Sequence, residues 1–179
     1  NMSESKDNLY LYEALELRGE YQSKLDSLKA LLPEQRKVQR GIWDRETNEY
    51  KEPASGFDPA EIREQIRSLE YKSRRLNTAI QQANFANDIW VNNEKMSIAE
   101  ALEIRKAVNQ ELAGLQKMLE RSAYRIVIYK EERNITQEPE DDFQEVYTRL
   151  EEKRILFRQL NRSLRKASFT VTVQFKDEA

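Results

Sequence analysis

The chain has 179 residues, of which 35% are charged and 39% are hydrophobic, and its net charge is −2. It contains no cysteine and no histidine, which excludes disulfide bonds, thiolate chemistry, Cys/His zinc sites and proton transfer by histidine. Only four glycines and four prolines occur, a balance that favours long helices. No apolar run approaches the roughly 20 residues that span a membrane, and the first residues, NMSESKDN, lack the apolar core of a signal peptide. We therefore expect a cytoplasmic, mainly α protein with no membrane segment.

The first predicted helix covers residues 11–32. Its apolar residues recur every three or four positions, as in a helix that buries one stripe. They are Leu11, Ala14, Tyr21, Leu25, Leu28 and Leu32, and Arg18 falls in the same series. The loop that follows is long, and within it IWDRETNEYKE predicts a small β-hairpin with ETNE at its tip.

The second predicted helix carries an apolar stripe over residues 62–83. Asp58 and Pro59 stand just before the stripe, where an N-cap side chain and a first-turn proline are favoured. The helix ends in FANDIWV, which predicts a short extended tail.

The third predicted helix starts at the capping box formed by Ser97 and Glu100. We expect it to continue to about Tyr129, although the β-branched run RIVIY also suits a strand. The fourth predicted helix covers 143–167 and ends in FTVTVQF, which alternates like a strand.

Two parts of the chain are nearly repeated. EALELRGEYQSKLDSLKALL (13–32) and EALEIRKAVNQELAGLQKML (100–119) are identical at 8 of 20 positions, where ordinary residue frequencies would give about one or two. LNTAIQQANF (76–85) and LNRSLRKASF (160–169) also align. The repetition indicates two related helical hairpins.

We therefore predict a single domain over 1–179, made of one hairpin over 8–91, with a long loop at 33–58, and a second over 96–175. Two such hairpins bury their stripes by forming a four-helix, coiled-coil-like bundle. The two extended tails are expected to pair with each other as a small sheet that closes one end.

Several short motifs resemble the septicolysin-like family of bacterial proteins. They are EALELR, LLPEQRKVQRG, IREQI leading into LNTAI, MSIAEALEIRKAVNQEL and LNRSL, and they extend over nearly the whole chain. The segment IWDRETNEY is an insertion relative to that pattern. The family is largely uncharacterised, so the resemblance supports the fold and implies no particular activity.

Arg18 and Arg105 occupy the same point of the repeated stripe, and Asn77 and Asn161 repeat beside the stripes of the returning helices. A guanidinium that faces a core must be paired. The candidate counter-charges for these arginines are Glu13, Glu16, Glu100 or Glu103. One hypothesis is a polar layer that fixes helix register, and the other is a site for a small anionic ligand.

Trp43 and Tyr50 lie in a charged loop where a monomer core does not explain them. Aromatic side chains of this kind are enriched in interfaces. They are the candidate contact surface for a protein partner.

The run KRILFRQLNRSLRK (153–166) has six basic residues and no acid. Such a face could bind phosphates, but the same helix begins with several acids, and acids at the start with bases at the end suit the helix dipole. Solvated surface is the favoured interpretation, and nucleic acid is not an expected partner.

No nucleophile with a base partner, glycine-rich phosphate loop or histidine-containing metal motif occurs in the sequence. We expect no cofactor, no metal and no catalytic residue. The hypothesis that fits best is a non-enzymatic helical scaffold that forms homo-oligomers, with nucleic-acid or small-anion binding by Arg and Lys groups as the alternative.

Overall fold

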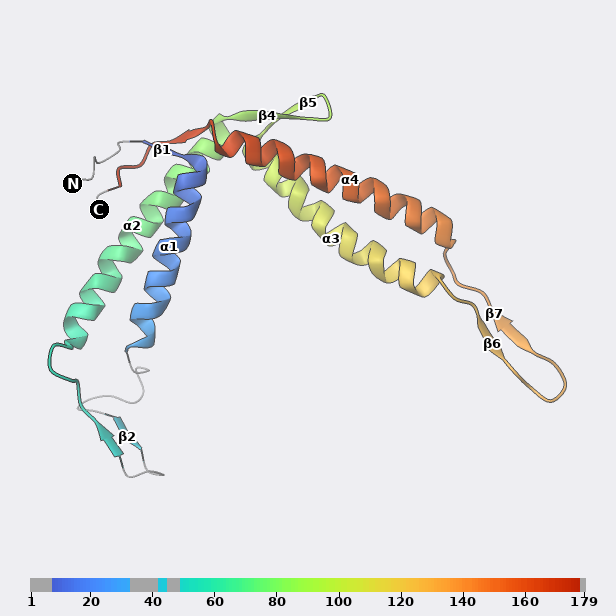
Figure 1. The fold of residues 1–179 in the computed structure, drawn as a ribbon, viewed down its shortest axis with the longest axis horizontal. Helices are drawn as coiled ribbons and strands as arrows, with labels where there is room; N and C mark the ends of the chain where they lie inside the picture. Colours follow the sequence, from blue (N-terminus) through green and yellow to red (C-terminus); the bar gives the residue numbers. More distant parts are fainter. Residues whose placement is uncertain (1–7, 33–41, 45–48, 178–179) are drawn as a thin grey trace. The chain divides into compact units, whose positions relative to one another are not determined.

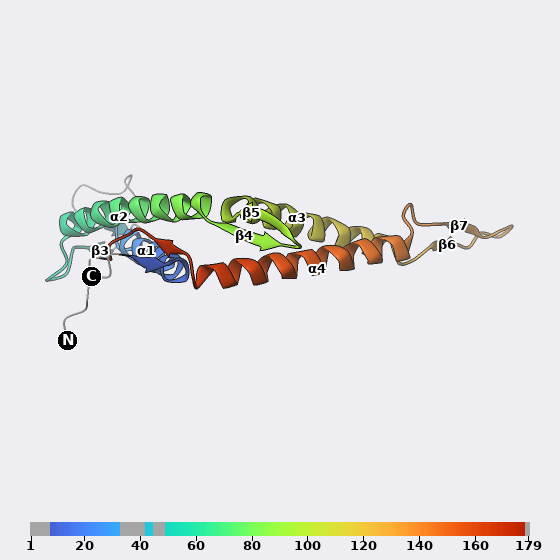
Figure 2. The same cartoon turned by 90° about the horizontal axis from the view of Figure 1, so that it is seen from above.

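The computed structural model describes residues 8–32, 42–44 and 49–177, and it is mainly helical. Four helices occur in these ranges: α1 (Leu11–Ala30), α2 (Pro59–Ala86), α3 (Ile98–Ser122) and α4 (Phe143–Ser168). Figure 1 shows that α1 and α2 run side by side, as do α3 and α4, and Figure 2 shows the same pairs from above. The mainly α prediction is confirmed.

The chain divides into two compact units. Unit 1 consists of Asn1–Ala83 with Thr172–Ala179, and unit 2 of Asn84–Val171. This division differs from the expected halves 8–91 and 96–175 because the last strand pairs with the first one. The single domain over 1–179 stays a prediction.

The helices begin where the sequence places favourable caps. The Asp58 carboxylate accepts a hydrogen bond from the Ala60 amide (3.0 Å), and the Ser97 hydroxyl accepts one from the Glu100 amide (3.1 Å). Each bond satisfies one backbone donor that has no partner within its helix. The predicted starts of α2 and α3 are therefore confirmed.

In unit 1 the buried stripes of α1 and α2 follow the predicted spacing. An ion pair between Lys29 and Glu70 (3.1 Å) joins the two helices at the surface. The buried side chains are Leu11, Ala14, Tyr21 and Leu25 of α1 and Ile66, Leu69, Leu76, Ala79, Ile80 and Ala83 of α2. Arg18 is missing from this set because its side chain is exposed.

In unit 2 the backbones of α3 and α4 approach each other closely along their length. Leu115, Val146 and Leu150 form the centre of a buried cluster between them. The partly buried side chains packed against this cluster are Leu112, Met118 and Leu119. This apolar contact holds the second hairpin together.

The prediction that the third helix continues to about Tyr129 is wrong, because α3 ends at Ser122. The β-branched run that follows forms strand β6 (Ile126–Ile128), which pairs antiparallel with β7 (Ile135–Gln137). Branched side chains lose χ1 freedom in a helix and fit the extended backbone better. Figure 1 shows this β6–β7 hairpin extending beyond the ends of α3 and α4.

The prediction that the tails after the second and fourth helices pair with each other is also wrong. The first tail forms β4 (Asp88–Val91), which turns back to pair with β5 (Glu94–Ser97). Asn92 and Asn93 make the turn with φ values of 50° and 64°, and this backbone is typical of the two-residue turns that asparagine tolerates. The second tail forms β8 (Thr172–Val173), which pairs with β1 (Leu9–Tyr10).

The two strand pairs have equivalent registers. Leu9 stands opposite Val173 in one pair, and Ile89 stands opposite Met96 in the other. Leu9 and Met96 occupy the same position before α1 and α3, and all four of these side chains are buried. The strand before α1 therefore pairs with the strand after α4 in the same register in which the strand before α3 pairs with the strand after α2.

Candidate functional site

Arg105 and Asn161, both predicted as site residues, lie together in unit 2. The Arg105 guanidinium donates a hydrogen bond from α3 to the Asn161 side-chain oxygen on α4 (3.2 Å). Both residues are partly buried. Within the described part of the chain, Arg105 has no ion pair, so its side-chain partner is an amide oxygen rather than a glutamate.

The equivalent pair in unit 1 does not form. Arg18 and Asn77 are both exposed, and no hydrogen bond joins them among the described residues. The prediction that the Arg18 side chain faces the core is therefore wrong: the buried stripe of α1 passes from Ala14 to Tyr21 and leaves position 18 in solvent. A single layer formed by Arg18 and Arg105 stays a prediction.

We expect a double-mutant cycle to separate these two pairs. Replacing Arg105 and Asn161 by alanine, singly and together, should give a coupling energy of about 1 kcal/mol, because a partly buried hydrogen bond is lost. The matched cycle on Arg18 and Asn77 should give a coupling near zero. Urea unfolding monitored by circular dichroism measures both. A coupling of equal size in the two cycles would contradict the difference in burial.

The candidate contact loop forms the predicted β-hairpin. Strand β2 (Ile42–Asp44) pairs antiparallel with β3 (Glu49–Lys51), and Trp43 stands opposite Tyr50. Tyr50 is 44% exposed. The side chain of Trp43 and residues 45–48, which hold most of the predicted tip, lie outside the described residues.

A second apolar surface lies on β6 and its flanks, and the sequence interpretation missed it by extending the helix. We call it the β6 ribbon. Its large side chains are Tyr124, Ile126, Val127, Ile128 and Tyr129, all of them exposed. Ile126 is 58% exposed and Tyr129 81%. The β-branched RIVIY run, with NITQ a few residues later, is the sequence signal for such a hairpin.

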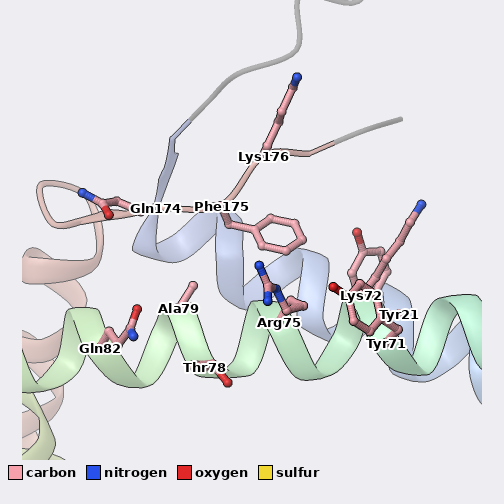
Figure 3. A pocket seen from close by; sticks show the side chains of 10 residues that line it. All are labelled: Tyr21, Tyr71, Lys72, Arg75, Thr78, Ala79, Gln82, Gln174, Phe175 and Lys176. Atoms are coloured by element: carbon pink, nitrogen blue, oxygen red, sulfur yellow. The ribbon is translucent and has the colours of Figure 1, made fainter.

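A cavity of about 570 Å³ lies in unit 1, between α1, α2 and the segment after β8. Figure 3 shows its lining, in which the Phe175 ring extends from that segment towards the Arg75 side chain on α2. Tyr21 comes from α1 and Tyr71 from α2. The sequence could not indicate this site, because its residues come from three separate segments.

The basic run on α4 is partly neutralised. Lys153 pairs with Glu111 of α3 (3.0 Å) and Arg154 pairs with Glu151. The Asp142 carboxylate caps the start of α4, and Arg165 and Lys166 lie in its last turn. This distribution complements the helix dipole, as predicted.

Two further features of the described residues concern metal binding and membrane insertion. Across residues 8–32, 42–44 and 49–177, no group of three or more acidic side chains is placed to hold a metal ion. None of the helices in these ranges combines the length and apolar character needed to cross a bilayer.

Comparisons with known proteins give one informative result. No protein-family model and no curated protein matches the chain. A solved structure resembles it, the crystal structure of a functionally unknown conserved protein from Corynebacterium diphtheriae, with a TM-score of 0.72 and 22% sequence identity. The match covers 93% of this chain and 99% of that chain. At this level of identity the likeness shows a shared fold.

Proposed function

We propose that the protein is a non-enzymatic helical scaffold that associates with further copies of itself. The observation that carries the proposal is the exposed β6 ribbon, which presents isoleucine, valine and tyrosine side chains to solvent at the tip of a helical hairpin. A two-stranded sheet alone is marginally stable. Its free edges are templates for another strand.

A second copy is the occupant that fits this edge. An antiparallel β6–β6 pair centred on Val127 would place Ile126 opposite Ile128 of the second copy. It would also place Arg125 opposite Tyr129, a favourable cation–π combination. Such pairing is two-fold symmetric and closes on itself, as in most homodimers. No like charges stand opposite each other in this register.

Replacing Val127 by lysine is expected to weaken self-association at least about tenfold, because the symmetric register brings the two introduced charges together. Sedimentation equilibrium over a range of micromolar concentrations measures the effect. Gln110→Lys, at an exposed position of α3, is the matched control and should associate like the parent chain.

Two outcomes would overturn this proposal. One is a parent mass equal to a single chain at every concentration. The other is unchanged association of Val127→Lys together with a native circular dichroism spectrum. If the Val127→Lys spectrum shows unfolding, Ile126→Thr is tested in its place, because it keeps the β-branch and introduces no charge while it replaces the apolar ethyl group by a hydroxyl.

We further propose that the chain arose by duplication of a helical hairpin. The equivalent registers of β1–β8 and β4–β5 support this idea. The capping positions support it as well. The Tyr10 amide donates to the Glu13 carboxylate (3.2 Å) before α1, and Ser97 and Glu100 form the corresponding cap before α3. The coiled-coil-like packing of the two hairpins into one bundle, and a kinship with septicolysin-like proteins, belong to the same proposal.

The second candidate function is nucleic-acid binding along α4. Arg158, Arg162 and Arg165 are exposed, lie on one face by their spacing, and make no ion pair with the described residues. Anisotropy titration with labelled RNA tests it, because phosphate binding must weaken steeply as salt increases. Absence of binding at low salt would remove this candidate.

A further inference from the structure

The cavity of unit 1 combines aromatic rings with cationic side chains. Its aromatic lining consists of Tyr21, Tyr71 and Phe175, and two α2 cations, Lys72 and Arg75, line the same space. The volume of about 570 Å³ lies in the usual range of small-molecule sites. Such a lining suits a ligand that has both a ring and a negative charge.

The charge of Arg75 is available to a ligand. Its guanidinium lies 5.8 Å from the centre of the Tyr71 ring, a cation–π contact that orients the side chain. Neither Arg75 nor Lys72 makes an ion pair with the residues that the structure describes. A planar guanidinium held in this way can bind a carboxylate or phosphate with two parallel hydrogen bonds.

The Tyr21 side of the cavity lies near acidic side chains, in contrast to the basic side formed by Arg75 and Lys72. Burial, with smaller contributions from Asp177 and Glu20, raises the pKa of Tyr21. The phenol therefore stays protonated at neutral pH, and the nearby carboxylates disfavour a second negative charge beside it. An anionic group is expected at Arg75 and Lys72, away from Asp177.

We propose that this cavity binds a small organic anion that carries an aromatic ring, of the aryl phosphate or aryl carboxylate class. The anionic group contacts Arg75 and Lys72, and the ring packs against Phe175 and Tyr71. This site is independent of the β6 ribbon, because all its residues belong to unit 1 and the ribbon belongs to unit 2.

Phenyl phosphate is the probe that tests the proposal. Titration into the ¹⁵N-labelled protein should shift amide signals of α2 and residues 174–176 in a saturable way, with a Kd on the order of 1 mM for so small a ligand. Arg75→Gln is expected to weaken binding about tenfold or more, because a charge-assisted hydrogen bond is lost. Arg74→Gln, one residue away, exposed and outside the cavity, should bind like the parent chain.

Two further titrations separate the contributions of ring and charge. Inorganic phosphate and phenol should each bind at least about tenfold more weakly than phenyl phosphate, because each lacks one half of the recognition. Phe175→Ala should weaken phenyl phosphate and leave inorganic phosphate unchanged.

Either of two results would overturn the proposal. The first is the absence of a saturable shift at millimolar phenyl phosphate. The second is equal binding by the Arg75→Gln and Arg74→Gln variants, which would indicate general attraction to surface charge. If the amide spectrum of Arg75→Gln showed that this variant is unfolded, Lys72→Gln would be titrated instead. Binding equal to that of Arg74→Gln would then overturn the proposal in the same way.

Discussion

Replacing Leu150 by alanine is expected to lower the free energy of unfolding by about 2–5 kcal/mol, because it leaves a cavity in the cluster between α3 and α4. Leu150 is 1% exposed and lies against Leu115 and Val146. A loss of this size corresponds to a decrease in melting temperature of roughly 5–15 °C for a chain of this length. Urea and thermal unfolding, monitored by circular dichroism, measure both quantities.

The matched control is Ile155→Ala on the same helix. Ile155 is 44% exposed, so its truncation removes little buried surface and should cost less than about 1 kcal/mol. Equal losses at the two positions would show that the α3–α4 contact described above does not hold unit 2 together.

Replacing Val173 by aspartate is expected to lower the free energy of unfolding by about 3 kcal/mol or more, an effect comparable to that of Leu150→Ala. Val173 is 0% exposed and stands opposite Leu9 in the β1–β8 pair. A carboxylate buried there must either stay desolvated or disrupt the strand pair. Thermal unfolding measures the loss, and Gln174→Asp, at the exposed next position, is expected to change the stability by less than about 0.5 kcal/mol.

The same substitution at the equivalent position of the other strand pair tests the proposed duplication. Ile89 is buried opposite Met96, so Ile89→Asp should lose a similar amount of stability. A large loss at Val173 with none at Ile89 would contradict the equivalence of the two pairs.

Much of the helical structure could be predicted because its causes are local. The spacing of apolar residues locates the buried face of α2, and Asp58 and Ser97 cap their helices through bonds to amides two or three residues away. The predicted end of α3 is wrong, because the RIVIY run satisfies both a helical and a strand pattern. Pairing with β7, a segment several residues further along, makes it a strand.

The candidate site residues could also be predicted only in part from the sequence. The repeated sequence points to Arg105 and Asn161, and the structure shows a hydrogen bond between them from α3 to α4. It gave the same weight to Arg18 and Asn77, yet these are exposed. Identical residues in two copies meet different surroundings, because the neighbouring side chains of α1 and α2 differ from those of α3 and α4.

The amino-acid sequence alone was sufficient for the helical class, the positions of the buried stripes and the starts of α2 and α3, because each depends on interactions within about one helical turn. The pairing of β1 with β8 and the assembly of the unit 1 cavity depend instead on segments far apart in the chain. Many alternative contacts could bury the same apolar surface, and the most stable combination over the whole chain determines which distant segments pair. A short-range pattern contains no information about these alternatives. For this reason the cavity beside Arg75 is recognisable only in the folded chain, whereas the β6 ribbon belongs to a local hairpin that the RIVIY run already indicates.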